Sequence, residues 1–399
     1  MGDYGSENLA CGSKEASPSL TIHAPEAHVS PLISPDVESY THTTFLDEQN
    51  GILNQSSHYP RDQADKARAY LRALWSDGPR SSTKPVEFII PYLSWSALRD
   101  DPEFTLQKLK ISYDSLKSVF TVFPMESMRH GHILGWVNQL ATFAQQNFDT
   151  SISRRFKTIQ NIGVRDFKGK WDGSFRKPDF VIAWRKDNGG IDIHTIVEVG
   201  VSQSQNQFRE VMEMYFEGLP QISRVILIDI IEAPQYVQPK NFDIDELKNL
   251  NSTEFQVASN QGPVWYKGIQ WVGHNTISWE VWERDPKMGY PVQIFKTTII
   301  PNDSGFQLPF FEIPTWIADN IEAVTVKSAD IDHLWSNDLR DAVIEEAKWR
   351  MGGYVSERSK QADETANIAR QEEEAEKKKQ KANEERAKRA RHRRGDQDN

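Results

Sequence analysis

Hydrophobic positions in the middle of the chain switch between helical spacing and short strand-like runs. In residues 126–147 the apolar positions that recur at helical spacing are Met128, Ile133, Leu134, Val137, Leu140 and Phe143. Runs typical of β-strands follow at 155–162, 178–184 and 194–200, and then come an amphipathic helix at 205–218 and an apolar strand at 223–231. The predicted order, α-β-β-β-α-β over roughly 120–232, is that of a mixed α/β (α+β) core.

The pattern divides the chain into four segments. Residues 1–62 are rich in Ser, Pro, Thr, His and Asn, and such a segment buries too little apolar surface to offset its ordering entropy, so we expect a disordered tail. We expect a helical N-terminal extension at 63–120 and a core at 121–335, in which additional β-hairpins follow the last core strand. Residues 336–399 are expected to form a charged helical tail.

The C-terminal tail lacks the apolar seam of a coiled coil. Beyond Glu357, Ile368 is the one large apolar residue among Glu, Lys, Arg, Ala and Gln. We therefore expect a solvated helix with opposite charges along its surface. The basic cluster RAKRARHRR at 386–394 predicts nuclear enrichment, with the cytoplasm as the alternative.

Composition narrows the function classes. The single cysteine, Cys11, excludes a disulfide framework and a cysteine-based zinc site, so an intracellular protein is expected. No stretch approaches the ~18 consecutive apolar residues that cross a bilayer, and no membrane association is expected. Because the net charge is −10, nucleic-acid binding would need a local basic patch.

A tight turn brings two carboxylates together. The pair Asn188-Gly189 favours a two-residue type I′ hairpin turn, because both turn positions need positive φ. In the register that this turn sets, Asp187 faces Gly190 and Asp179 faces Glu198, with Cβ atoms roughly 4.5–5.5 Å apart. A bulge in the hairpin would shift this register.

Two facing carboxylates in an apolar hairpin need compensation. The oxygens of Asp179 and Glu198, with the backbone carbonyl of Val199 and water, suit Mg²⁺ or Mn²⁺. Such an ion polarises a phosphodiester and lowers the pKa of bound water. The alternative is that Asp179 is a turn residue at the start of its strand and that Glu198 pairs with Arg or Lys.

The residues around this pair form a larger motif. The sequence RKPDFVI at 176–182, followed by IVEVG at 196–200, resembles the signature of the PD-(D/E)XK (restriction-endonuclease-like) nuclease superfamily. The following serine, helix, Tyr215 and apolar strand resemble a fungal group of that superfamily and a large bacterial group of predicted endonucleases. The resemblance implies a restriction-endonuclease-like αβββαβ fold and Mg²⁺- or Mn²⁺-dependent cleavage of nucleic acid, with Asp179 and Glu198 as metal ligands.

One feature of the superfamily is missing from the motif. The superfamily's lysine stands two residues after the glutamate or, in the bacterial group, four residues before the tyrosine; here these positions hold Gly200 and Val211. Gln203 and Arg209 are candidate replacements, since a glutamine can position water and Arg209 carries positive charge. Arg209 is a poor general base because of its high pKa. For both residues, ordinary polar surface at the rim of a helix is the alternative.

A basic stripe at 151–190 flanks the proposed metal site. Basic residues outnumber acidic ones there, namely Arg154, Arg155, Lys157, Arg165, Lys168, Lys170, Arg176, Lys177, Arg185 and Lys186. Such a stripe would hold a phosphate backbone without reading sequence, and solvated loop charge is the alternative.

Two functions therefore compete: a metal-dependent phosphodiesterase (nuclease) acting on DNA or RNA, and a catalytically inactive nuclease-like binding or regulatory module. A third, an interaction protein acting through its charged C-terminal helix, gives no reason for the Asp179/Glu198 hairpin. The sequence leaves the substrate and the oligomeric state open.

Overall fold

The computed structural model describes residues 59–77, 85–101, 109–123, 127–201, 205–240, 242–247, 250–299, 307–317, 322–327 and 338–395. The chain divides into two compact units. One contains the residues up to Glu232 together with Asn275–Leu339, and the other contains Ala233–His274 together with Arg340–Asn399. The expected tail at 1–62 lies outside the described residues up to position 58.

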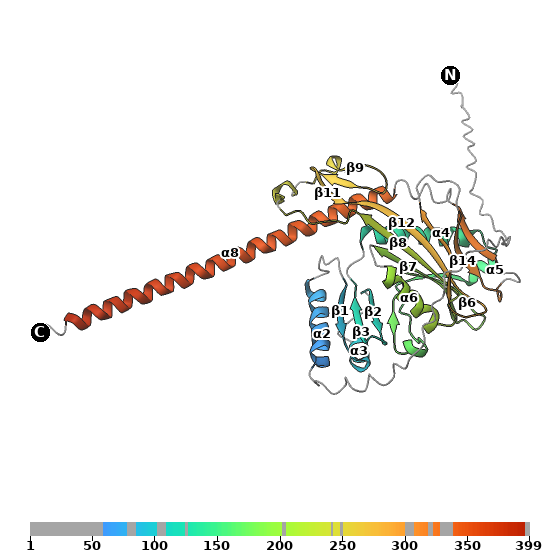
Figure 1. Cartoon of the computed structure of the whole chain (residues 1–399), viewed down its shortest axis with the longest axis horizontal. Helices are drawn as coiled ribbons and strands as arrows, with labels where there is room; N and C mark the ends of the chain where they lie inside the picture. Colours follow the sequence, from blue (N-terminus) through green and yellow to red (C-terminus); the bar gives the residue numbers. More distant parts are fainter. Residues whose placement is uncertain are drawn as a thin grey trace, which may run out of the picture. The chain divides into compact units, whose positions relative to one another are not determined.

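A six-stranded mixed sheet forms the centre of the first unit, in the order β13-β12-β8-β7-β6-β4 (Figure 1). Its strands are β4 (Phe156–Gln160), β6 (Phe180–Arg185), β7 (Ile191–Val201), β8 (Arg224–Ala233), β12 (His274–Arg284) and β13 (Pro291–Ile299). β7 and β8 are parallel, because the helix α6 (Gln205–Gly218) connects them as a crossover. With α4 (Met128–Gln146) in front, the observed order is α4-β4-β6-β7-α6-β8, and the mixed α/β class is confirmed.

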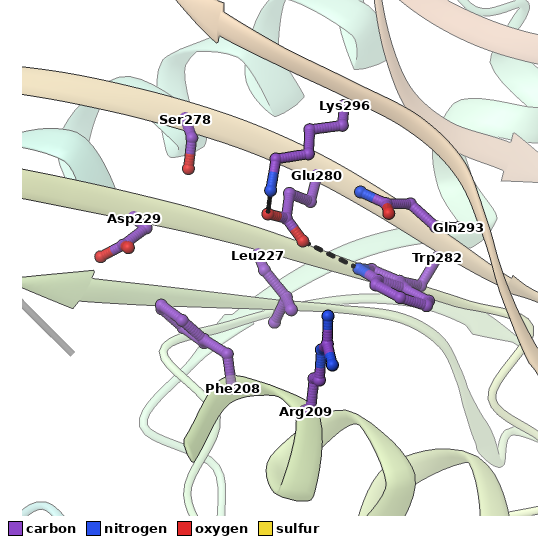
Figure 2. Close-up of a pocket in the computed structure, with 9 residues that line it drawn as sticks. All are labelled: Phe208, Arg209, Leu227, Asp229, Ser278, Glu280, Trp282, Gln293 and Lys296. Atoms are coloured by element: carbon purple, nitrogen blue, oxygen red, sulfur yellow. Dashed lines mark hydrogen bonds and ion pairs between the residues drawn. The ribbon is translucent and has the colours of Figure 1, made fainter. Parts of the chain in front are cut away.

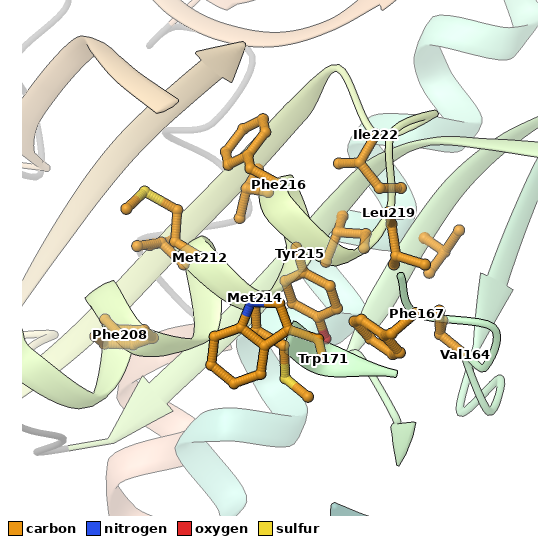
Figure 3. Packing of buried hydrophobic residues seen from close by; sticks show 14 of the residues in the cluster. Val164, Phe167, Trp171, Phe208, Met212, Met214, Tyr215, Phe216, Leu219 and Ile222 are labelled. Atoms are coloured by element: carbon orange, nitrogen blue, oxygen red, sulfur yellow. The ribbon is translucent and has the colours of Figure 1, made fainter. Parts of the chain in front are cut away.

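The two helices cover opposite faces of this sheet. On one face α6 packs through Phe208, Met212 and Tyr215 against a cluster that includes Ile196 and Leu227 (Figure 3). Side chains alternate along a strand, so Glu232 of β8 points to the other face, where it forms a buried ion pair with Arg129 of α4 at 3.0 Å. The α6 face, to which Glu198 and Leu227 belong, is the one that carries the candidate site.

The helical extension expected at 63–120 contains a sheet as well as helices. Helix α2 (Tyr59–Asp77) begins earlier than expected, and α3 (Tyr92–Arg99) is short. Between and after them lie the strands β1 (Val86–Ile89), β2 (Ile111–Asp114) and β3 (Val119–Val122), which join β5 (Phe175–Arg176) in the order β1-β3-β2-β5. The expected helical extension at 63–120 is wrong for residues 111–122, because ISYD and VFTV are short strands around a turn, too short for periodicity to separate from helix.

The N-terminal sheet has an aromatic core. Trp95 is fully buried and stacks on Tyr113 with ring centroids 5.1 Å apart. Phe120 and Phe175 lie 5.1 and 5.7 Å from the same indole. Because Phe175 belongs to β5, directly before Asp179, this core anchors the N-terminal sheet to the strand that leads into the candidate site.

The β6–β7 hairpin reaches the expected register by an unexpected route. Its turn is the loop Asp187–Gly189 closed by Lys186 and Gly190, where the Lys186 N–H donates to the Gly190 carbonyl at 2.8 Å. Only Gly189 has positive φ (82°), so the predicted type I′ turn was wrong and Arg185 pairs with Ile191. A bulge then adds His194 to β7, because Ile182 faces Thr195 whereas Ala183 faces Ile193. The two departures cancel, and Phe180 faces Val197 as predicted.

The remaining part of the first unit is a hairpin of β14 (Gln307–Ile313) and β15 (Glu322–Lys327). Phe311 of β14 packs 5.3 Å from Phe156 and 6.3 Å from Trp184, measured between ring centroids. The pairing of β12 with β13 corresponds to the expected additional β-hairpins, and the β14–β15 hairpin follows it in the chain.

The second unit combines a small sheet with the long helix α8 (Asp338–Gly395). The sheet consists of β9 (Gln256–Val257), β10 (Val264–Tyr266) and β11 (Ile269–Val272). Tyr354 packs against the Trp271 ring, and Arg350 donates to the Trp271 carbonyl at 2.7 Å. The expected charged C-terminal helix is present, and it is exposed from Glu357 onward apart from the partly exposed Arg358, up to Arg386; the side chains of 387–394 in the basic cluster are outside the described set. Among the described residues, no helix is both long enough and apolar enough to cross a bilayer.

Candidate functional site

Asp179 and Glu198 occupy neighbouring positions on the α6 face of the sheet. Asp179 directly precedes β6, and the pairing of Phe180 with Val197 places it beside Glu198, whose pKa the Asp179 charge raises. Both residues are buried, 2% and 3% exposed. The predicted juxtaposition of the two carboxylates therefore holds in the structure.

The Asp179 carboxylate is held from three sides. Its Oδ2 accepts from the backbone N–H of Val199 at 2.8 Å and lies 3.2 Å from His130 Nε2 at the start of α4. Its Oδ1 forms an ion pair with the ammonium of Lys110, which directly precedes β2. Three separate elements therefore converge on one side chain.

The Glu198 carboxylate has a different set of partners. Its Oε1 accepts from Tyr215 Oη at 2.6 Å and from Arg176 Nε at 3.0 Å. Tyr215 is fully buried in the α6 cluster, and the Arg176 guanidinium lies over its ring. The alternative that Glu198 pairs with an arginine is therefore realised, together with the juxtaposition to Asp179.

These surroundings separate the pKa values of the two carboxyl groups. Burial raises the pKa of Asp179, but the charges of Lys110 and His130 outweigh burial and the net pKa lies well below the usual range. Burial also raises the pKa of Glu198, and there the nearby Asp179 charge adds to it, so that Arg176 and Lys110 do not bring the pKa back to normal. The first carboxyl is thus ionised, and the second is the one that takes up a proton more readily.

Lys110 is a lysine at the site that the hairpin motif does not contain. It comes from the N-terminal sheet, whose strand β2 pairs Ser112 with Arg176 and Tyr113 with Phe175 of β5. The side chain of Lys110 is 14% exposed and also lies over the Phe123 ring. The positive charge that Gly200 and Val211 cannot supply therefore reaches Asp179 from outside the αβββαβ core.

Lys177 braces the segment that carries Lys110. Its ammonium donates to the Leu109 carbonyl at 2.8 Å. The residue is 6% exposed, and burial lowers its pKa to about 8. Lys177 thus fixes the backbone directly before Lys110, on the same side as Asp179.

The donors at the site fit a hard divalent cation in their chemistry. Asp179 and Glu198 supply carboxylate oxygens, and the N–H of Val199 already points at Asp179. Because the N–H and C=O of one strand residue point to the same side of the strand, the Val199 carbonyl faces the same side. Among the described residues, however, no group of three or more His, Cys, Asp or Glu side chains is arranged to hold a metal, so water and backbone would complete such a site.

Of the two predicted replacements for the lysine, Arg209 is among the described residues. Gln203 lies outside the described residues. Arg209 is exposed on α6 and lines a cavity next to β8 and β12, where it lies near Glu280 and Trp282 (Figure 2). Val211 is packed against the α6 cluster, and Gly200 pairs with Asp229 in the parallel ladder.

The basic stripe at 151–190 splits into two groups. Arg176 and Lys177 point into the site and are not available as surface charge. Among the others, Arg155 pairs with Asp187, Lys170 with Glu217 and Lys186 with Asp192. The exposed members outside those pairs are Arg154, Arg165, Lys168 and Arg185.

Sequence reasoning missed Lys110 and His130 as members of the site. Lys110 stands in the segment expected to be a helical extension, and the motif around Asp179 and Glu198 does not include His130. The pattern of the core gave no signal for Lys110, since its place depends on how a separate sheet packs. Comparison of the chain with protein-family models, with curated proteins and with solved structures found no match.

Proposed function

We propose that the chain is a metal-dependent phosphodiesterase (nuclease) of the PD-(D/E)XK, restriction-endonuclease-like type, acting on DNA or RNA. The observation that carries the proposal is the ion pair between Lys110 and Asp179, next to Glu198. It supplies the cation that the hairpin motif lacks. Two carboxylates and a lysine are the residue types that metal-assisted phosphodiester hydrolysis needs.

Each residue has a distinct role in this proposal. Asp179, Glu198 and the Val199 carbonyl would hold Mg²⁺ or Mn²⁺, which when bound supplies a water of lowered pKa and polarises the phosphodiester. Lys110 provides positive charge beside the scissile phosphate. Tyr215 and Arg176 orient Glu198 through its Oε1, and Lys177 keeps the Leu109 backbone in place.

The exposed cations of the basic stripe suit a nucleic-acid backbone. Arg154 lies in the last turn of α5 (Thr150–Arg155), a helix that contacts β6, and Arg185 is the last residue of β6. Arg165 and Lys168 lie in the loop after β4. These side chains would contact phosphates of the nucleic acid. We therefore expect the affinity for nucleic acid to fall as the salt concentration rises.

The first experiment is a cleavage assay with purified protein on labelled single- and double-stranded DNA and RNA in Mg²⁺, Mn²⁺ or EDTA. We expect cleavage in metal only, and loss to background in Glu198→Gln because a metal ligand is removed. The matched control is Glu210→Gln, an exposed glutamate on α6 that pairs with Lys117. Cleavage that survives Glu198→Gln would point to a contaminant or to another site.

A second experiment tests metal binding without turnover. Mn²⁺ bound at this site stabilises the folded protein, so its effect on Tm should be smaller in Asp179→Asn than in the wild type. An equal rise in both proteins would locate this metal elsewhere.

The alternative is a catalytically inactive nuclease-like module. The ion pairs of Asp179 and Glu198 favour this alternative because they neutralise both carboxylates. Lys110 and Arg176 already compensate Asp179 and Glu198, so that a metal ion would have to displace protein cations. Robust binding of nucleic acid with no metal-dependent cleavage, and a Tm response to Mn²⁺ that Asp179→Asn leaves unchanged, is the outcome that this alternative predicts.

A further inference from the structure

A second acidic site lies on the same face of the sheet, beside β8 and β12. A cavity of about 30 Å³ is lined by α6, β8, β12 and β13, and the polar side chains around it are Arg209, Asp229, Ser278, Glu280, Gln293 and Lys296 (Figure 2). A volume of this size is about that of one water molecule or one small ion. Asp229 pairs in register with Gly200, two residues beyond the partners Glu198 and Leu227 and therefore on the same face.

Two oxygens on residues that line this cavity have no hydrogen-bond partner among the described residues. They are Asp229 Oδ1 and Ser278 Oγ, on residues that are 4% and 8% exposed. A buried polar atom without a partner costs free energy, and buried polar atoms in folded proteins nearly always have one. The cavity therefore presents oxygens that a bound species would satisfy.

Glu280 adds a third oxygen ligand of the same kind. Its Oε1 pairs with Lys296 at 2.6 Å, and its Oε2 accepts from Trp282 Nε1 at 3.2 Å. The Lys296 side chain is 48% exposed whereas that of Glu280 is 12% exposed. Lys296 can thus move into water when a bound cation replaces its charge beside Glu280, which already lines the cavity.

We propose that Asp229, Ser278 and Glu280 bind one small hard cation, such as Ca²⁺, Mg²⁺ or Mn²⁺, at a site separate from Asp179 and Glu198. Two carboxylates and a hydroxyl are hard oxygen ligands, and the remaining positions are open to water at the rim formed by Gln293, Lys296 and Arg209. An ion bound there would take ligands from both β8 and β12, next to Phe208 and Arg209 of α6. The site stands on its own residues and does not depend on the proposed nuclease activity.

The test is the number of ions bound, measured by calorimetry with Ca²⁺ and by Tb³⁺ luminescence. Trp282 lines the cavity and sensitises Tb³⁺ held within it, and Trp282→Phe reports which part of the emission comes from this site. The double variant Asp179→Asn/Glu198→Gln should still bind one ion. Asp229→Asn should lower the affinity of that ion at least ~10-fold, since one of its two carboxylates is lost.

Two further variants separate this site from a folding defect. Ser278→Ala removes one oxygen without changing charge and should weaken binding less than Asp229→Asn does. Glu210→Gln, on the exposed side of α6, should leave Ca²⁺ affinity unchanged. Circular dichroism of each variant without metal checks that it is folded.

The outcomes distinguish the two metal proposals. A double variant Asp179→Asn/Glu198→Gln that binds no ion overturns the second site, as does a Ca²⁺ affinity that Asp229→Asn leaves unchanged. A wild type that binds one ion, lost in Asp229→Asn and retained in the double variant, supports the second site and counts against metal at Asp179 and Glu198.

Discussion

The two acidic sites on the α6 face of the central sheet differ in how their charge is compensated. At the first, the carboxylates of Asp179 and Glu198 contact Lys110, His130 and Arg176, which carry or can carry positive charge. At the second, Asp229 Oδ1 has no partner among the described residues. Burial raises the pKa of Asp229 to about 6, and the nearby Glu280 adds to the shift.

The difference follows from which parts of the chain reach each site. The N-terminal sheet and the start of α4 both reach Asp179 at the start of β6, where Lys110 and His130 contact its carboxylate. Around Asp229 the described neighbours are strands of the same sheet and one turn of α6. At the second site Lys296 of β13 pairs with Glu280 and leaves Asp229 Oδ1 without a partner, so in our proposal a bound ion supplies the compensation that the first site receives from the fold.

The largest expected effect comes from removing the core of the N-terminal sheet. Trp95→Ala deletes a fully buried indole and should lower the free energy of unfolding by about 3–5 kcal/mol. Hydrogen exchange should show lost protection in β1, β2 and β3, while Ca²⁺ affinity at Asp229 stays unchanged. Trp316→Ala is the control, since Trp316 is 44% exposed and should change stability by less than ~0.5 kcal/mol. Equal loss of Ca²⁺ affinity would show that the two sites are not independent.

The next largest effect is expected from replacing Lys110 alone, with the N-terminal sheet left intact. Lys110→Met should raise the pKa of Asp179, because burial then acts without the ammonium that opposes it. If the chain is a nuclease, cleavage should fall about 10²–10³-fold, the loss expected for one transition-state stabiliser. Carboxyl carbon NMR measures the pKa, and Lys117→Met, on the exposed turn between β2 and β3, is the control.

The outcome against this interpretation is a pKa of Asp179 that does not move in Lys110→Met. Arg209→Ala provides a second comparison, because Arg209 lines the other cavity. A larger loss of cleavage in Arg209→Ala than in Lys110→Met would return the catalytic role to Arg209.

A smaller effect concerns His194, the extra residue of the bulge that restores the hairpin register. Burial, and then the charge of Arg224, lower the pKa of His194 to about 4, although Asp192 opposes them. Between pH 6.5 and 4 the unfolded chain therefore binds more protons at this residue, and stability falls as pH falls through that window. We expect His194→Asn to remove about 2 kcal/mol of this pH dependence. Denaturant titrations of both proteins at pH 7 and pH 4 measure it, and parallel curves would contradict the assignment.

The smallest effect tests the turn itself. Gly189 has φ of 82°, so Gly189→Ala should cost about 1 kcal/mol although no atom lies within 4 Å of the added Cβ. Gly135→Ala is the matched control in helix α4, where the Cβ also meets nothing, and it should stabilise by up to ~1 kcal/mol. Equal effects of the two substitutions in thermal unfolding would mean that the turn is not strained.

Much of the core could be read from the sequence because local pattern determines it. The αβββαβ order followed from periodicity, and the α6 stripe of Phe208, Met212 and Tyr215 faces the sheet as its spacing predicts. The sequence also predicted that Asp179 and Glu198 lie beside each other, but from a two-residue turn that the hairpin does not have. The turn was one residue off, and the bulge at His194 that corrects it has no clear sequence signature.

The residues that complete the two sites were decided only by tertiary structure. Lys110 approaches Asp179 because β2 pairs with β5, a contact between segments far apart in the chain that no local pattern encodes. Asp229 and Glu280 line one cavity because β12 is the neighbour of β8 in the sheet. In the sequence these two strands are separated by a segment that belongs to the second unit. Sequence periodicity reports which face a side chain takes within its own strand or helix. Which strands and helices then meet depends on packing between separate elements, and that packing determined the charge at each acidic site.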